Sequence, residues 1–189
     1  EGFKTSSKVQ YVARVGNFID HGAQYHGALQ ILKVILSYDY LWQNVRVKGG
    51  AYGCMSNFNR IGEGYLISYR DPNLKKTMEV YEGVVDYLKN FTVDERDMTK
   101  YIIGTIGSMD MPMEAVDMGA RSFHAYFLGK TEADLQKVRD QVLSCTQEDI
   151  RALAPIVKAV VEAGNRCCIG NEEKIDQNKE YFDEVKHVL

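Results

Sequence analysis

The sequence lacks the long apolar run of a membrane-spanning helix, because none of its apolar stretches approaches the roughly 20 residues required. Its first residues are polar and lack the apolar core of a signal peptide, so secretion is not expected. Clusters of basic residues are also missing, and the formal net charge is −3, which argues against nucleic-acid binding. These absences predict a protein of the cytoplasm, or of an organelle matrix in a eukaryote, without a membrane or nucleic-acid partner.

Motifs for disulfides and metals are scarce too. The cysteines at positions 54, 145, 167 and 168 do not have the C-x-x-C spacing. Two of them are adjacent, and adjacent cysteines rarely form a disulfide because the geometry is strained. We therefore expect structural thiols in a reducing compartment. His21 and His26 match neither the H-E-x-x-H nor the H-x-x-E-H spacing, so no metal ligands are predicted in this chain.

What the sequence does contain is typical of a globular protein, with 45% hydrophobic and 26% charged residues. A length of 189 residues suits one domain with a proper core. We find no internal repeat, low-complexity run or linker, so a single domain over residues 1–189 is expected. The first residue is Glu1 rather than methionine, as expected for a piece of a longer polypeptide.

The first half of the chain predicts a strand, a helix and a hairpin. Residues 8–15 alternate as in a half-buried strand, with Tyr11 and Val15 on the apolar face and Arg14 on the polar one. Apolar residues at helical spacing over residues 25–45 predict a central helix buried on more than one side. The strands of the hairpin are expected at 52–59 and 65–70.

The second half predicts mainly helices. Asp71 and Pro72 indicate one helix start, and Thr92, Thr131 and Thr146 indicate others, each with an acidic residue three positions later. A short strand follows at 166–170. Strands joined by a hairpin and long helical excursions favour an α+β domain with a largely antiparallel sheet. The order of the strands stays open.

Several side chains in this half are expected to pack against neighbours. Gly104 and Gly107 suggest the close approach of another backbone segment. Met109, Met111 and Met113 are interpreted as fillers of gaps at the core, because methionine adapts to irregular spaces. His124 falls inside a predicted helix and is interpreted as a packing residue.

The stretch between the central helix and the hairpin, residues 46–53, reads R-V-K-G-G-A-Y-G. Gly49 and Gly50 let the backbone adopt positive φ or approach another chain closely. Arg46 and Tyr52 flank them, and both side chains are good hydrogen-bond donors. Donors aimed at one point stabilise a negatively charged reaction intermediate. Composition alone favours a simpler interpretation, in which the glycines end a helix, Arg46 is solvated and Tyr52 begins a strand.

The run V-R-V-K-G-G-A-Y-G at 45–53 resembles a signature of the pitrilysin/insulinase family of zinc metallopeptidases, in particular its presequence-protease branch. The similarity continues through Y-I-I-G-T-I-G at 101–107, Asp110, S-F at 122–123, Tyr126 and L-G at 128–129. It extends over residues 9–171. The resemblance implies the metallopeptidase half-domain fold, with helices on one face of the sheet, and implies that this chain is the last of four related domains.

The resemblance also implies roles for individual residues. Tyr52 matches a tyrosine that donates to the oxyanion formed from the substrate's peptide carbonyl, and Arg46 matches an arginine that holds the substrate backbone. Gly49 and Gly50 would shape the substrate-binding loop. The zinc would be bound by another domain of the full-length enzyme, so this chain alone should bind no zinc and cleave nothing. The implied partners are unfolded peptides, degraded in an enclosed chamber, and the N-terminal catalytic domains of the same polypeptide.

Two alternatives stay open. The same fold also occurs in proteins that have lost peptidase chemistry and act as structural or interaction domains. The presence of both Arg46 and Tyr52 weighs against that alternative. A cysteine hydrolase that uses Cys54 with a histidine is the weaker possibility, because no motif supports it.

Overall fold

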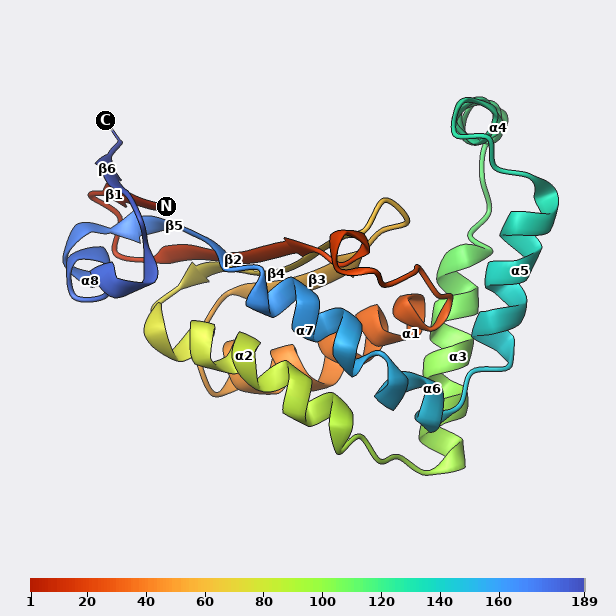
Figure 1. Cartoon of the computed structure of the whole chain (residues 1–189), viewed down its shortest axis with the longest axis horizontal. Coiled ribbons are helices and arrows are strands. Elements are labelled where there is room, and N and C mark those ends of the chain that lie inside the picture. Colours follow the sequence, from red (N-terminus) through yellow and green to blue (C-terminus); the bar gives the residue numbers. More distant parts are fainter. Residues whose placement is uncertain (189) are drawn as a thin grey trace.

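The computed structural model describes residues 1–188 and contains one sheet of six strands (Figure 1). The strands are β1 (Gly2–Thr5), β2 (Gln10–Asn17), β3 (Gly53–Phe58), β4 (Glu63–Asp71), β5 (Asn165–Asn171) and β6 (Val185–His187). Their order across the sheet is β3-β4-β2-β5-β1-β6. The pairs β3–β4, β4–β2 and β2–β5 are antiparallel, whereas β1 runs parallel to β5 and β6. The predicted α+β class with a largely antiparallel sheet is confirmed, although the sequence patterns indicate neither β1 nor β6.

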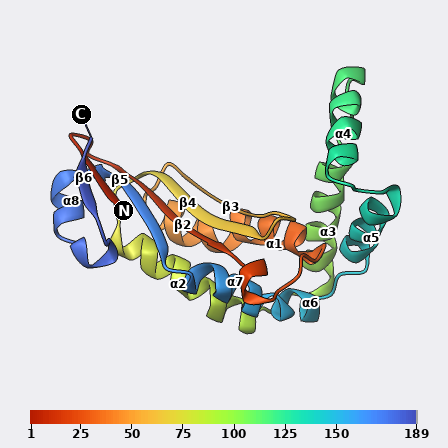
Figure 2. The same ribbon diagram turned by 45° about the horizontal axis from the view of Figure 1, so that its top comes forward.

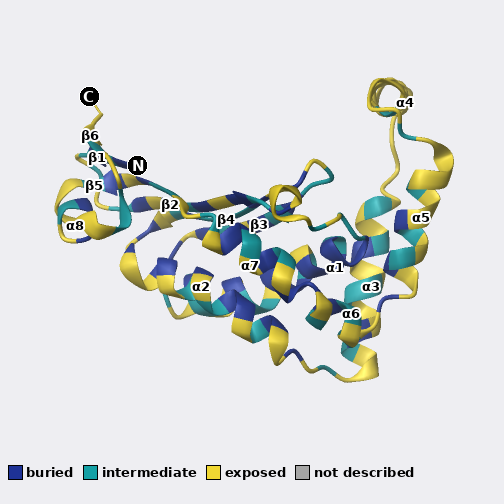
Figure 3. Ribbon diagram, in the orientation of Figure 1, coloured by how far each residue is buried: buried dark blue, intermediate teal, exposed yellow. Residues whose placement is uncertain are grey.

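Helices α1 (Ala28–Ile35), α2 (Lys75–Lys89) and α7 (Ala154–Glu162) cover one face of this sheet (Figure 1). The core lies between the helices and the sheet, where the buried segments face one another (Figure 3). Phe18, Leu66 and Tyr81 are among its largest fully buried side chains. Within residues 1–188 no helix covers the opposite face of the sheet (Figures 1 and 2), and that face exposes apolar side chains such as Met55 and Ile169.

The remaining helices lie toward the ends of the sheet. They are α3 (Glu95–Met109), α4 (Ala115–Phe127), α5 (Glu132–Leu143), α6 (Gln147–Ala152) and α8 (Glu172–Asp176), with short 3-10 helices η1 (Ile19–His21) and η4 (Lys179–Tyr181). α3 and α5 run side by side, and α4 stands away from the body of the domain in both views (Figures 1 and 2). Among residues 1–188, no helix combines the length and apolar character needed to cross a membrane.

The orientation of β2 is the reverse of the predicted one. Arg14 and Gln10 face the helices and are buried, whereas Tyr11 and Val15 point to the open face of the sheet. The Arg14 guanidinium donates through Nε to the carbonyl oxygen of Val161 (2.7 Å), and the Gln10 amide oxygen accepts from a backbone N–H of β5 (2.8 Å). Because these hydrogen bonds compensate for burial, polar side chains occupy the face that the apolar pattern assigned to solvent.

The predicted central helix is present, but only its first part is α-helical. After α1 the chain continues through two π-helical segments, η2 (Leu36–Tyr40) and η3 (Trp42–Val47). The Lys48 N–H accordingly bonds to the Gln43 carbonyl, five residues earlier (3.0 Å). π-helical turns are rare and occur frequently at functional sites. The wider turns end directly before the glycine pair.

Two of the predicted helix caps are confirmed and two helix starts are wrong. Thr131 and Thr146 form capping boxes with the acidic residues three positions later. Thr92 does not cap α3, because the Asp94 side chain accepts from the Asp97 N–H (2.8 Å) and takes that place. α2 begins at Lys75, later than Asp71 and Pro72 suggested.

The packing predicted around α3 and α4 is wrong at most of the positions named. A side chain added at Gly104 or Gly107 would meet no atom within 4 Å, so neither glycine permits a close backbone approach here. Met109 is partly buried and packs against the core, as predicted, but Met111, Met113 and His124 are exposed. The reason is geometric, since α4 and the loop before it extend beyond the part of the domain that could cover them (Figure 3).

Candidate functional site

The glycine pair ends the π-helical segment and turns the chain toward β3. Gly50 has a φ of 81°, a left-handed conformation that strains other residues. Its N–H bonds to the Arg46 carbonyl (2.8 Å), and the next N–H, of Ala51, bonds to the Val45 carbonyl (3.1 Å). These bonds satisfy carbonyls at the helix end that have no partner inside the helix. At Gly49 a side chain would collide with the Val45 carbonyl, so both positions favour glycine.

Tyr52 lies one residue before β3, which is an edge strand of the sheet. Its backbone is fixed by a bond from its N–H to the Arg70 carbonyl (3.2 Å). The ring packs edge-on against Tyr69, with 5.5 Å between centroids, and remains 61% exposed. At Gly53 a side chain would collide with the Tyr69 ring, so this glycine allows the aromatic pair to form. The phenol is therefore mounted on a fixed backbone and is open to solvent.

Arg46 is half-buried on the last turn of η3. Its guanidinium carbon lies 3.8 Å from the centroid of the Trp42 ring, which is a cation–π arrangement. The arginine and Tyr52 thus flank the glycine pair, as expected, but each packs against a different aromatic partner. Among residues 1–188 no hydrogen bond joins the two side chains, so their convergence on one point stays a prediction.

A buried polar cluster lies directly behind this loop, and the sequence patterns did not indicate it. Asp71 is fully buried at the end of β4, and its carboxylate accepts hydrogen bonds from Ser68 (2.7 Å), Thr77 (2.7 Å) and the Asn73 N–H (2.8 Å). The Asn73 amide in turn donates to the Gly49 carbonyl (2.6 Å). An aspartate followed by proline and asparagine is a known turn signal, and it could have identified this turn but not its distant partners.

Cys54 lies near this cluster, and its chemistry does not suit a nucleophile. Burial raises the pKa of its thiol to about 11, and the smaller opposing effect of the Arg46 charge does not reverse that shift. The reactive form of cysteine is the thiolate. Because the thiol stays protonated near neutral pH, the geometry argues against a cysteine hydrolase built on this residue.

The described residues of this chain, 1–188, do not fit a zinc ion. Within residues 1–188 no three histidine, cysteine, aspartate or glutamate side chains gather as metal ligands. A catalytic zinc usually takes three protein ligands. We therefore derive no chemical step through a metal held by this chain.

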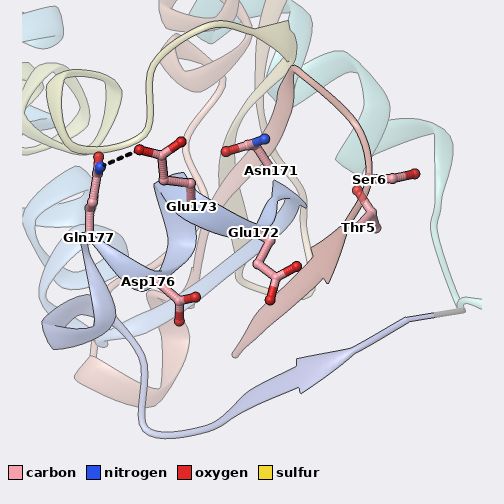
Figure 4. Close-up of a pocket in the computed structure, with 7 residues that line it drawn as sticks. All are labelled: Thr5, Ser6, Asn171, Glu172, Glu173, Asp176 and Gln177. Carbon is pink, nitrogen blue, oxygen red and sulfur yellow. Dashed lines mark hydrogen bonds between the residues drawn. The ribbon is translucent and has the colours of Figure 1, made fainter.

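A second polar feature, a hollow between β1 and α8, is shown in Figure 4. It is lined by Thr5, Ser6, Asn171, Glu172, Glu173, Asp176 and Gln177. Lys4 forms an ion pair with Asp176 (2.6 Å), and Gln177 donates to Glu173 (3.0 Å). The Lys4 ammonium thus neutralises the Asp176 carboxylate. The hollow lies beside β1, and three strands separate β1 from the edge strand β3 in the sheet. We assign it no function.

Comparison with known proteins identifies the family. The model of the PreP C-terminal domain matches residues 1–171. The chain belongs to the PreP C-terminal domain family. This PreP C-terminal domain is 48% identical over 189 residues to Protein HypA of Clostridium perfringens, covering 100% of the chain and 19% of that protein. It is 34% identical over 193 residues to Presequence protease 1, chloroplastic/mitochondrial, of Arabidopsis thaliana, covering 100% of the chain and 18% of that protein.

The fold of the PreP C-terminal domain is also found among solved structures. One similar structure is the peptidase M16 inactive domain from Pseudomonas fluorescens, with a TM-score of 0.61 and 19% identity. The match covers 89% of this chain and 41% of the other. At that identity the likeness concerns the fold alone. The chain spans about a fifth of the length of the curated relatives named above.

Proposed function

We propose that this chain is the C-terminal part of a zinc metalloendopeptidase that degrades unfolded peptides in an enclosed chamber. In this proposal Tyr52 stabilises the oxyanion, Arg46 binds the substrate backbone, and Gly49 and Gly50 shape the loop. The observation that carries it is the 61% exposed phenol of Tyr52, mounted at the end of an edge strand on a fixed backbone. The membership of the PreP C-terminal domain family supports it.

Peptide hydrolysis is accelerated by a hydrogen-bond donor whose bond to the carbonyl oxygen becomes stronger as negative charge develops there. Attack on a peptide carbonyl turns its oxygen into an oxyanion, and a phenol O–H donates to such an oxygen. Among residues 1–188 the Tyr52 hydroxyl forms no hydrogen bond, so it needs no rearrangement to meet a substrate. Its N–H bond to Arg70 and its contact with Tyr69 limit where the hydroxyl can move.

Arg46 suits ground-state binding. Its guanidinium has five N–H donors and no acceptor, and stacking on Trp42 fixes its plane while the edges stay available. Backbone carbonyls of an extended peptide are acceptors at regular spacing. The free edge of β3 offers main-chain groups to the same peptide, and pairing of this kind demands little of the substrate sequence.

The zinc would be held by a part of the polypeptide outside this chain, since the described residues offer no ligand set. When bound there, the metal supplies an activated water at neutral pH. The relatives' greater length leaves room for such a domain. The name of the Arabidopsis relative points to organelles, and four free cysteines suit a reducing compartment, so we place the protein in the cytoplasm or an organelle matrix.

The exposed helix α4 supports contact with the rest of the polypeptide. None of its residues is buried, although several of them are apolar. Val116, Phe123 and Phe127 are 73%, 61% and 69% exposed. We propose that another domain of the same polypeptide covers this face. In the full-length protein, replacing Phe123 and Phe127 by serine should accelerate limited proteolysis between the domains about tenfold, the typical effect of losing an aromatic anchor. Ile61→Ser, at an equally exposed hairpin position, should not; equal rates for both variants would contradict this contact.

The alternative is a structural or interaction domain without a catalytic role. The different aromatic partners of Arg46 and Tyr52, with no hydrogen bond between the two side chains among residues 1–188, favour it. The two functions differ in what they predict for the Tyr52 hydroxyl, which the structural role does not need.

The test is Tyr52→Phe in the full-length protein. Loss of one oxyanion donor typically lowers turnover on the order of a hundred- to a thousandfold, equal to about 2.7–4 kcal/mol. We expect this loss in kcat, with little change in KM and an unchanged Tm, because the ring and its contacts remain. Tyr38→Phe, at a 69% exposed position on η2, is the matched control. Turnover within a few-fold of the wild type, with zinc content intact, would exclude the catalytic role.

A further inference from the structure

The loop that carries the glycine pair is tied to the body of the domain through one buried carboxylate. Asp71 has no exposed surface, and Oδ2 accepts from both the Ser68 and Thr77 hydroxyls at 2.7 Å. Oδ1 accepts from the Asn73 N–H at 2.8 Å. The donors come from β4, from the turn after it and from α2. Charge-assisted hydrogen bonds of this kind are stronger than neutral ones, so the carboxylate holds three segments in one geometry.

Asn73 connects this cluster to the glycine pair. Its side-chain amide donates to the Gly49 carbonyl at 2.6 Å, across 24 residues of sequence. The ring of Pro72 lies near Gly50. A Cβ atom added at Gly50 would be 3.5 Å from Pro72 Cγ, an ordinary contact distance. The turn after β4 therefore holds Gly49 through a hydrogen bond and passes close to Gly50.

The same turn also fixes Tyr52. The Arg70 carbonyl accepts the Tyr52 N–H at 3.2 Å, and Arg70 has a φ of 48°, unusual for a residue other than glycine. Asp71 is the next residue in the chain. The hydrogen bonds of its carboxylate therefore also limit how the Arg70 carbonyl is oriented. Two routes thus lead from the buried carboxylate to the proposed oxyanion donor, through Asn73 and Gly49 and through Arg70.

We propose that Asn73, anchored by Asp71, is a positioning residue that sets the place of the Tyr52 hydroxyl for catalysis. This inference rests on the proposed function. Asn73 touches no substrate in this proposal and acts by limiting the movement of the loop. A displacement of about 1 Å at a reacting group can cost a hundredfold in rate, so a tether of one hydrogen bond is enough to matter.

The test is a double-mutant cycle in the full-length protein with Asn73→Ala and Tyr52→Phe. Asn73→Ala removes the side-chain bond to the Gly49 carbonyl and a longer one to Asp71 Oδ1 (3.5 Å), but it keeps the backbone N–H bond to Asp71. We expect kcat to fall about tenfold when Tyr52 is present and less than about twofold in the Tyr52→Phe background, because no phenol is left to position. Hydrogen exchange of the Gly50–Tyr52 amides should become faster in the Asn73→Ala protein. Asn73→Leu, which keeps the size of the side chain but has no N–H donor and no charge, serves if the alanine variant does not fold.

Asn178→Ala is the matched control. It also loses a side-chain amide bond to a backbone carbonyl (2.8 Å to Lys174), but beside α8 at the other edge of the sheet. It should change neither kcat nor exchange in the loop. Equal loss of kcat in both backgrounds, or unchanged amide exchange in the loop, would overturn the positioning role while leaving the proposed function intact. A near-normal Tyr52→Phe enzyme would instead remove the proposed function, and the role of Asn73 with it.

Discussion

The guanidinium of Arg14 donates through Nε to the carbonyl oxygen of Val161 at 2.7 Å. Val161 belongs to the last turn of α7, where carbonyls have no partner inside the helix. The bond therefore caps the helix from the sheet, and a cation at this end also suits the helix dipole. Close packing reinforces it, since a side chain at Gly16 of β2 would lie 2.6 Å from the Val160 carbonyl. α7 and β2 are joined at this point.

Arg14→Met should destabilise the domain because it leaves the Val161 carbonyl buried without a donor. A buried group that loses a charged hydrogen-bond partner typically costs about 1–3 kcal/mol. Arg151→Met is the matched control: Arg151 also donates through Nε to a carbonyl, that of Phe91 (2.8 Å), but about a third of its side chain is exposed. Urea unfolding should show the larger loss for Arg14→Met, and equal losses would contradict the capping role.

Arg14 and Val161 show why part of the fold cannot be predicted from the sequence. Alternation predicts a strand at β2, but it places Arg14 in solvent because charged side chains are usually exposed. Only the approach of α7, some 147 residues later in the chain, supplies the carbonyl that makes burial favourable. The central helix and the hairpin were predictable because their signals, apolar spacing and turn residues, lie within each element.

The candidate site divides in the same way. The flanking of Gly49 and Gly50 by Arg46 and Tyr52 can be read from the sequence, and a φ of 81° at Gly50 confirms a need for glycine there. The hydrogen bond from Asn73 to Gly49 cannot be predicted from the sequence, because the whole fold sets how the two segments lie relative to each other. The expected packing of Gly104 also failed, since this chain alone offers no segment to approach it.

Two glycines with opposite environments give the next prediction. Gly50→Ala should destabilise the protein by about 1 kcal/mol or more, because a left-handed conformation costs other residues roughly that amount. Gly104→Ala should instead stabilise it by about 0.4–1 kcal/mol, since α3 accepts alanine and no atom lies within 4 Å. Thermal melts of both variants measure the difference. A shift of the same sign in both would be inconsistent with these two conformations.

The stacking of Arg46 on Trp42 predicts how substitutions there will differ. Arg46→Ala in the full-length protein should raise KM and lower kcat together, because a guanidinium that holds substrate backbone acts in the ground state and the transition state. Arg46→Lys should restore KM and kcat only in part, because an ammonium lacks the planar arrangement of N–H donors of a guanidinium. Arg46→Ala should also cost about 0.5–1 kcal/mol of stability through the lost cation–π contact, and Arg46→Lys should cost less, because an ammonium can still lie over the Trp42 ring.

Arg60→Ala provides the control for Arg46. Its guanidinium carbon lies 5.6 Å from the Tyr25 ring, so it removes a cation–π contact at the hairpin turn, at the other end of β3. It should affect stability without the change in KM. If Arg46→Ala altered stability alone, as Arg60→Ala is expected to do, Arg46 would not bind substrate.

The buried cysteines Cys145 and Cys168 should make the protein less stable at alkaline pH. Burial raises the pKa of the Cys145 and Cys168 thiols to about 12. In the unfolded chain a thiol loses its proton near pH 8.5. Between these values the unfolded state binds fewer protons than the folded state, so the free energy of unfolding falls as pH rises. The stability is fully present below about pH 8.5, and each thiol then removes up to about 1.4 kcal/mol per pH unit.

Urea unfolding under reducing conditions at pH 7.0, 8.5 and 10 measures this slope. Cys168→Ala should lower the stability at pH 7 but make the fall toward pH 10 shallower, because one of the titrating thiols is gone. Val142→Ala, at another fully buried position next to Cys145, also removes core volume but no thiol, so it should keep the wild-type slope. Tyrosines cannot account for a difference between these two variants, since both keep all of them. Parallel pH profiles for Cys168→Ala and Val142→Ala would mean that the buried thiols do not cause the alkaline loss of stability.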